Sequence, residues 1–183
     1  MDPREPVETH IQIIWSFVRL VVVKRALADV LPETKIDFWR IIQGASLDLG
    51  LIEWCKVFGS NADDTHWTKA VPAAQHDDFR KGLFAAVGMT DKEWEAYWKK
   101  MTGYRNELAA HHDLNAKTTH YPNFDAALEA SYYYYNSFLY PEWVAKNPRT
   151  GYPADLKAYV AGYNDETLAI VKAAAAATQQ FEP

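Results

Sequence analysis

The spacing of the prolines most constrains what this chain can fold into. After the amino-terminal segment they fall at Pro32, Pro72, Pro122, Pro141 and in the stretch 148–153. Proline ends helices because it lacks an N–H and its ring clashes with the preceding turn, so the long stretches between these prolines have room for helices. Apolar residues recur in them at helical intervals, and no strand–turn–strand pattern stands out. The sequence therefore predicts an all-α fold.

The same punctuation predicts the bounds of six helices. We expect them at residues 7–30, 35–58, 73–87, 90–113, 124–140 and 156–178. Two features compete with these assignments, because "VRLVVV" at 18–23 is β-branched enough for a strand and Gly162 allows an interruption of the last helix. Three prolines and one glycine predict a loop over "PEWVAKNPRTGYPADL", residues 141–156.

Local signals support the second, third and fourth helices. In the second, apolar residues recur at helical spacing, namely Phe38, Ile41, Ile42, Leu49, Ile52 and Val57, and Gly59 followed by "SNADD" ends it. The third begins after Pro72 and ends at Gly88, the usual asymmetry of proline at the start and glycine at the end. Thr90 and Glu93 predict a capping box for the fourth. There Trp94, Trp98, Met101 and Leu108 form a heptad-like seam, which is typical of an antiparallel bundle.

Composition places the chain among single folded domains. Its 183 residues, 49% of them apolar and 23% charged, suit one domain over 1–183. The single cysteine, Cys55, excludes an intramolecular disulfide and is expected to be a buried, inert thiol. We see no signal peptide, and the apolar run at 11–25 is short and broken by Arg19, so we expect no membrane span and a cytoplasmic protein.

The stretch "MTGYRNELAAHHDL", residues 101–114, does not suit an ordinary packed helix. In a regular helix of about 100° per residue, Arg105 and His112 share a face and continue the apolar seam. Charge at such positions is unfavourable unless the groups are paired or line a cleft. Residues 99–120 are also locally basic, with Lys99, Lys100, Arg105 and Lys117 against Glu107 and Asp113, although the whole chain has a net charge of −5. That overall charge argues against a surface that holds long nucleic acid by bulk attraction.

The stretch "YRNELAAHHD" resembles the signature of the HEPN superfamily (higher eukaryotes and prokaryotes nucleotide-binding domains). That signature is an arginine, a polar residue, and a histidine a few positions later. Arg105 and Asn106 match its first two positions, and His111 or His112 matches the last, after five or six intervening residues. "EWCKVFGS" followed by "DDTHW" further resembles the branch named after bacterial abortive-infection proteins, in which Ala-His ends the motif and favours His111. The resemblance covers about residues 35–140.

The resemblance implies an antiparallel helical bundle, here with additional C-terminal helices, that forms a homodimer with two motif helices at a shared cleft. It also implies a metal-independent endoribonuclease in phage defence or a toxin–antitoxin-like system, with RNA as substrate and an antitoxin or regulatory protein as partner. The residue types suit this chemistry, because histidine titrates near neutral pH and arginine holds phosphate oxygens with a planar fork. Arg105, Asn106, His111 and His112 are thus the candidate catalytic residues, and no cofactor or metal is required.

Two other readings of the sequence stay open. A metal-dependent phosphohydrolase could take ligands from His112 and Asp113, from His76 and Asp77, and from Asp125, but their spacing fixes no ligand set. Alternatively, the chain is a non-catalytic dimeric bundle, in which Arg105 pairs with Glu107 or Asp113 and the histidines favour the helix end. The remaining histidines, at 10, 66, 76 and 120, are interpreted as surface or structural residues.

Overall fold

A computed structural model describes residues 6–109 and 121–183 of the protein, and every regular element in them is helical, which confirms the all-α fold. The α-helices are α1 (Pro6–Val30), α2 (Asp37–Phe58), α3 (His76–Val87), α4 (Asp91–Tyr104), α5 (Asp125–Tyr134), α6 (Tyr140–Lys146) and α7 (Leu156–Thr178). π-Helical turns follow α4 at Arg105–Ala109 and α5 at Tyr135–Leu139. Short 3₁₀ turns occupy Trp67–Lys69, Ala73–Gln75 and Gln179–Phe181.

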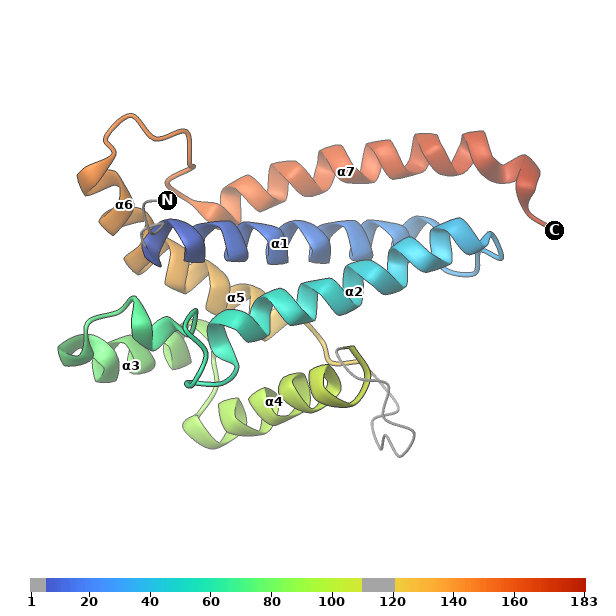
Figure 1. Ribbon diagram of the computed structural model, residues 1–183. Coiled ribbons are helices and arrows are strands. Elements are labelled where there is room, and N and C mark those ends of the chain that lie inside the picture. The colour runs from blue at the N-terminus through green and yellow to red at the C-terminus, as the bar shows by residue number, and fades with distance from the viewer. Residues whose placement is uncertain (1–5, 110–120) are drawn as a thin grey trace.

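Three long helices form the frame of the molecule (Figure 1). α1 lies in the middle, with α7 parallel to it on one side and α2 antiparallel to it on the other. At Gly50 the two helices lie close together, and a Cβ there would be in ordinary contact with Leu20 of α1, at 3.5 Å. At the far end of the frame, Ala26, Leu27 and Val171 form a small core of their own.

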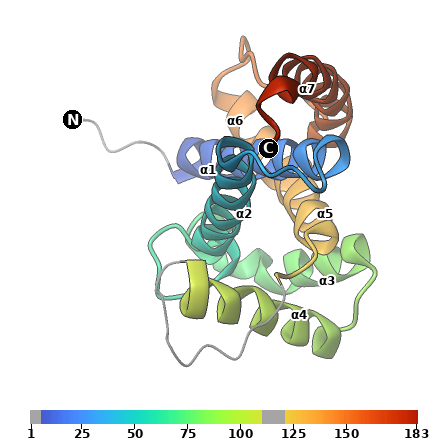
Figure 2. The same cartoon turned by 90° about the vertical axis from the view of Figure 1, so that its right-hand side faces the viewer.

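The main core lies where the shorter helices pack against the frame. Its fully buried side chains include Ile14 and Phe17 of α1, Trp54 of α2, Met101 of α4 and Tyr134 of α5. Seen along the frame, α3 and α4 lie on the side of the α1–α2 pair opposite to α7 (Figure 2). Helix α4, which leads into the motif, is therefore separated from α7 by α1 and α2.

Most of the predicted bounds are confirmed. α1 spans the whole first segment, so the strand alternative for "VRLVVV" is wrong; Val18, Val21 and Val22 are buried at helical spacing, and this packing overrides their β propensity. Gly88 ends α3 with a left-handed φ of 65°, as the start and stop pattern predicts. At Gly59 a Cβ would lie 2.3 Å from the carbonyl oxygen of Cys55, which requires glycine at the end of α2.

In the carboxyl-terminal third one helix is confirmed and one loop prediction is wrong. α7 has the predicted bounds and runs without the interruption that Gly162 would allow, since one glycine lowers helix stability only modestly. The predicted loop at 141–156 begins late, because α6 continues to Lys146 with Pro141 in its first turn. The preceding π-turn explains this, because it changes the hydrogen-bonding register just where proline supplies no N–H.

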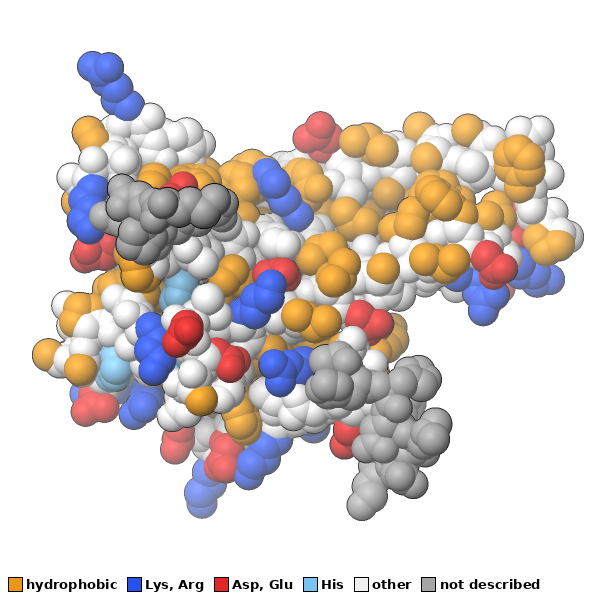
Figure 3. Space-filling view, in the orientation of Figure 1, with side chains coloured by type: hydrophobic (Ala, Val, Ile, Leu, Met, Phe, Trp, Pro, Cys, Tyr) orange, Lys and Arg blue, Asp and Glu red, His pale blue; other side chains and the backbone are white. Residues whose placement is uncertain are grey.

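The apolar spacing of α2 correctly predicts a helix, yet several of its members face outward. The side chains of Phe38, Ile41 and Leu49 are 60%, 68% and 50% exposed. Orange side chains gather over the distal half of the frame in Figure 3, where α2 extends past the shorter helices. Within residues 6–109 and 121–183, no helix is long and apolar enough to cross a membrane.

Candidate functional site

The first half of the motif belongs to α4, whose start is fixed by the predicted capping box. Thr90 Oγ1 accepts the N–H of Glu93 at 3.3 Å, and the Glu93 carboxylate accepts the N–H of Thr90 at 2.8 Å. Three members of the seam are confirmed, because Trp94 and Trp98 pack half-buried against the core and Met101 is fully buried. The fourth, Leu108, lies half-buried in the π-turn after α4. The seam orients α4 so that its last turn lies against α2.

The motif itself begins a π-helical turn, Arg105–Ala109. Its two first side chains lie together, since Arg105 Nη1 donates to Asn106 Oδ1 at 2.8 Å. Arg105 is half-buried and Asn106 is exposed. A π-turn bonds residue i to i+5 and is wider than an α-turn, so residues 105–109 do not follow the regular spacing of about 100° per residue. Arg105 and Asn106 form a pair at the start of this turn, and Asn106 is exposed.

Helix α2 forms the surface beneath this turn. Tyr104 donates its hydroxyl to Asp48 Oδ1 at 3.3 Å, and burial, with the Asp48 charge adding to it, raises the pKa of Tyr104 to about 12. Arg105 is near enough to Cys55 to oppose the shift of its thiol, but burial dominates and raises the pKa of Cys55 to about 12. The prediction of a buried thiol is confirmed, since only 2% of Cys55 is exposed.

The second half of the motif, with His111, His112 and Asp113, lies outside the described residues. The same is true of Lys117 and His120, which follow the motif. Their roles and their geometry relative to Arg105 stay predictions. Of the basic residues expected near the motif, Lys99 is described and forms an ion pair with Glu95 at 2.7 Å, and Lys100 is exposed.

A second cation, Lys24 of α1, lies near α4, and no sequence pattern identifies it. Lys24 Nζ of α1 is 4.5 Å from the ring centroid of Tyr121, and the Tyr121 hydroxyl is close enough to Tyr104 to contribute to its raised pKa. Lys24 and Tyr121 are 97 residues apart in the chain. No local pattern could have paired them, because only the packing of α1 against the start of α5 brings them together.

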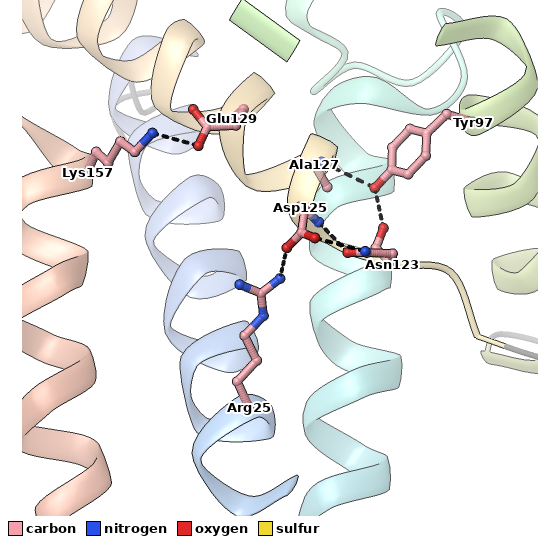
Figure 4. A network of polar contacts seen from close by, with 7 residues as sticks. All are labelled: Arg25, Tyr97, Asn123, Asp125, Ala127, Glu129 and Lys157. Atoms are coloured by element: carbon pink, nitrogen blue, oxygen red, sulfur yellow. Dashed lines mark hydrogen bonds and ion pairs between the residues drawn. The ribbon is translucent and has the colours of Figure 1, made fainter. Parts of the chain in front are cut away.

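A polar network holds α4 to α1 and α5 (Figure 4). Tyr97 donates to the carbonyl of Asn123 at 2.7 Å and accepts the N–H of Ala127 at 3.2 Å. Asp125 accepts from the Asn123 amide at 2.8 Å and pairs with Arg25. These two partners, the Asn123 amide first, lower the pKa of Asp125. The network therefore holds the segment before α5 against α1 and α4.

The described members of the metal-ligand alternative have other partners. His76 Nε2 bonds the carbonyl of Val71 at 2.8 Å, Asp77 lies 3.7 Å from Arg80, and Asp125 belongs to the network above. Over residues 6–109 and 121–183, no three His, Cys, Asp or Glu side chains are grouped to hold a metal ion.

Two histidines prove to be buried core residues. His10 and His66 are 1% and 6% exposed, and His10 Nδ1 lies 2.6 Å from the Tyr134 hydroxyl. Desolvation lowers the pKa of each to about 4. A signal was present for His10, because it lies three, four and seven positions before Ile13, Ile14 and Phe17, on the buried face of α1.

Neither Arg105 nor Asn106 lines any of four well-formed cavities of the described chain. No protein-family model, curated protein or solved structure matches the chain.

Proposed function

We propose that this protein is a metal-independent endoribonuclease of the HEPN type, acting in phage defence or a toxin–antitoxin-like system. Arg105, Asn106, His111 and His112 would form its site. The observation that carries the proposal is the pairing of the Arg105 and Asn106 side chains, 2.8 Å apart, on an accessible π-turn. A half-exposed guanidinium beside an exposed amide suits contact with a phosphate.

The π-turn supports a functional role because such turns are rare and frequent at functional sites. The other π-turn of the described chain, Tyr135–Leu139, precedes Pro141, whose missing N–H accounts for it. No proline lies between residues 101 and 121, so the turn at Arg105 has no such local cause. A π-turn at the motif changes the directions in which the motif side chains point, which suits a functional site.

The proposed chemistry is attack of a ribose 2′-hydroxyl on the adjacent phosphodiester. His111, with His112 supporting or replacing it, takes the proton of the hydroxyl as the P–O2′ bond forms, and passes it to the 5′-oxygen as the P–O5′ bond breaks. Arg105 holds the phosphate oxygens, on which negative charge builds in the transition state. Asn106 orients the arginine through the hydrogen bond already formed. The products carry a 2′,3′-cyclic phosphate and a free 5′-hydroxyl.

The proposal includes a homodimer in which the motif helices lie near the twofold axis. The exposed apolar side chains of α2, Phe38, Ile41 and Leu49, support an interface, because α2 is the helix against which the motif turn packs. Sedimentation at micromolar concentration should give a dimer, and Leu49→Lys should shift it to monomer. A wild-type monomer at that concentration would contradict this part of the proposal.

The function is tested by incubating the purified protein with mixed RNA in the presence of EDTA. We expect cleavage to 2′,3′-cyclic ends in the wild type and its loss in Arg105→Ala. Arg149→Ala is the matched control, since Arg149 is an exposed arginine in the loop before α7. If no RNA is cut, or if Arg105→Ala cuts as fast as the control, the bundle is a binding protein, the alternative that the exposed face of α2 also suits.

A further inference from the structure

A second candidate site lies between α1 and α7, away from the motif. An open cavity of about 610 Å³ follows α1 toward α7 and the loop before α7. This volume lies within the roughly 300–1,000 Å³ of small-molecule sites. The lining side chains that matter are Gln12, Trp15, Ser16, Arg19, Tyr152 and Tyr163.

The helical pattern itself builds this cavity. Gln12, Ser16 and Arg19 are four and three positions apart, so they share the outward face of α1. On α7, Tyr159 and Tyr163 are four apart and stack with their centroids separated by 6.1 Å. Two helix faces, one polar and one aromatic, therefore meet along a single groove.

Arg19 is held in a fixed position by the rings around it. Its guanidinium carbon lies 4.5 Å from the Trp15 ring centroid and 5.8 Å from that of Tyr163. Its Nη2 donates to the Tyr159 hydroxyl at 3.2 Å. Trp15 is in turn fixed by Tyr159, which stacks on it at 4.8 Å, and by Tyr152, which meets it edge-on at 5.5 Å. The arginine is thus oriented before any ligand arrives, which lowers the entropy lost on binding.

The guanidinium has donors left for an anion. Arginine carries five N–H donors in a planar fork, and the bond to Tyr159 uses one of them. No carboxylate among residues 6–109 and 121–183 forms an ion pair with Arg19. Phosphate and carboxylate are the groups that match this fork.

The charge of its lining residues distinguishes this cavity from three others. Each of those contains at least one carboxylate, such as Asp91, Glu129 or Asp125, whereas the described lining of this one has a cation and no acidic residue. In a chain of net charge −5, a groove with only positive charge selects for anions. Its half-buried rings, Tyr152 and Tyr163, favour a flat apolar body.

We propose that this cavity binds a small aromatic anion, with the anionic group on Arg19 and the planar ring against the tyrosines. A nucleotide and an aromatic carboxylate share this chemistry. The site lies between α1 and α7, and α7 is on the opposite side of the α1–α2 pair from α4 (Figure 2), so the site is separate from the proposed ribonuclease site.

Calorimetric titration of the full chain tests the proposal and distinguishes the two sources. The probes are AMP and indole-3-acetate, with adenosine, indole, inorganic phosphate and acetate as the separate halves of each. We expect at least one whole probe to bind at least tenfold more tightly than either of its halves. Failure of both whole probes to bind at millimolar concentration would overturn the proposal.

Variants assign the binding to Arg19. Arg19→Gln should weaken it by about 10- to 100-fold, the range expected for a hydrogen-bonded charge, while Arg149→Gln should leave it unchanged. Because Arg19 also bonds Tyr159, Arg19→Lys is the second variant; it keeps the charge and should bind between wild type and Arg19→Gln. Wild-type affinity in both Arg19 variants would refute the site, whatever the outcome of the RNA assay.

Discussion

Arg105 is the residue on which the proposed chemistry most depends. Its planar fork is already oriented by Asn106, and an ammonium cannot reproduce such a fork. We expect Arg105→Ala to slow cleavage by about 10² to 10³, the usual effect of removing one charge-stabilising donor. Arg105→Lys should restore only part of the rate. Initial rates on a short labelled RNA in EDTA measure both, and full activity in the lysine variant would exclude the bidentate role.

The adjacent histidines should differ in their effect on the rate. His111 follows alanine, as the motif of the abortive-infection branch requires, so we expect His111→Ala to lose about 10² to 10⁴ in rate as the general acid–base. His112→Ala should lose less, and the double variant should lose no more than about the larger single effect, because residues acting as one unit are not additive. Single-turnover cleavage compares the three. A larger loss in His112→Ala would reverse the assignment, and a full rate in the double variant would remove histidine from the mechanism.

Replacement of glycine by alanine should have opposite effects on stability in α3 and in α7. A Cβ at Gly82 of α3 would lie 2.0 Å from the Tyr133 hydroxyl of α5, whereas a Cβ at Gly162 of α7 would meet nothing within 4 Å. We expect Gly82→Ala to lower the free energy of unfolding by about 1–3 kcal/mol through overpacking. Gly162→Ala should raise it by up to about 1 kcal/mol, because alanine favours the helix. Urea unfolding measures both, and equal signs would show that α3 and α5 pack differently.

Helix ends were predictable because their causes are local. Thr90 with Glu93, Gly88 after α3 and Gly59 after α2 each act through atoms a few residues away. The continuation of the helix through Pro141 was not, since it depends on a π-turn that no short pattern specifies. The outward face of α2 was not predictable either, because the exposure of Phe38 depends on where the other helices end.

At the scale of the whole molecule, the two candidate sites differ in the same way, since one depends on local sequence and the other on long-range packing. Sequence identified Arg105 and Asn106, which are neighbours in the chain and prove to be neighbours in space. It did not identify the groove around Arg19, because that residue meets Tyr159 across 140 positions of chain. Pairings of this kind follow from the way α7 packs on α1, and periodicity within either helix contains no information about them.

Two buried histidines make the stability of the whole fold depend on pH. His10 and His66 are 1% and 6% exposed, and burial, the largest cause for each, lowers the pKa of both from 6.5 to about 4. The unfolded chain therefore binds more protons than the folded one between about pH 6.5 and 4. Stability is complete above pH 6.5 and is lost as pH falls through this window, since unfolding then takes up protons.

We expect the free energy of unfolding to fall between pH 7 and pH 5 by about 2 kcal/mol for each of these histidines. The change should be small between pH 8 and pH 7, where neither group titrates, so that interval is the internal control. Replacing His10 and His66 together with glutamine should flatten the dependence, even though it lowers stability at pH 7, where Tyr134 loses the ring nitrogen 2.6 Å from its hydroxyl. Urea unfolding followed by circular dichroism at the three pH values measures these slopes. A pH dependence as steep in the double variant as in the wild type would show that other groups, such as the surface carboxylates, cause the loss of stability in acid.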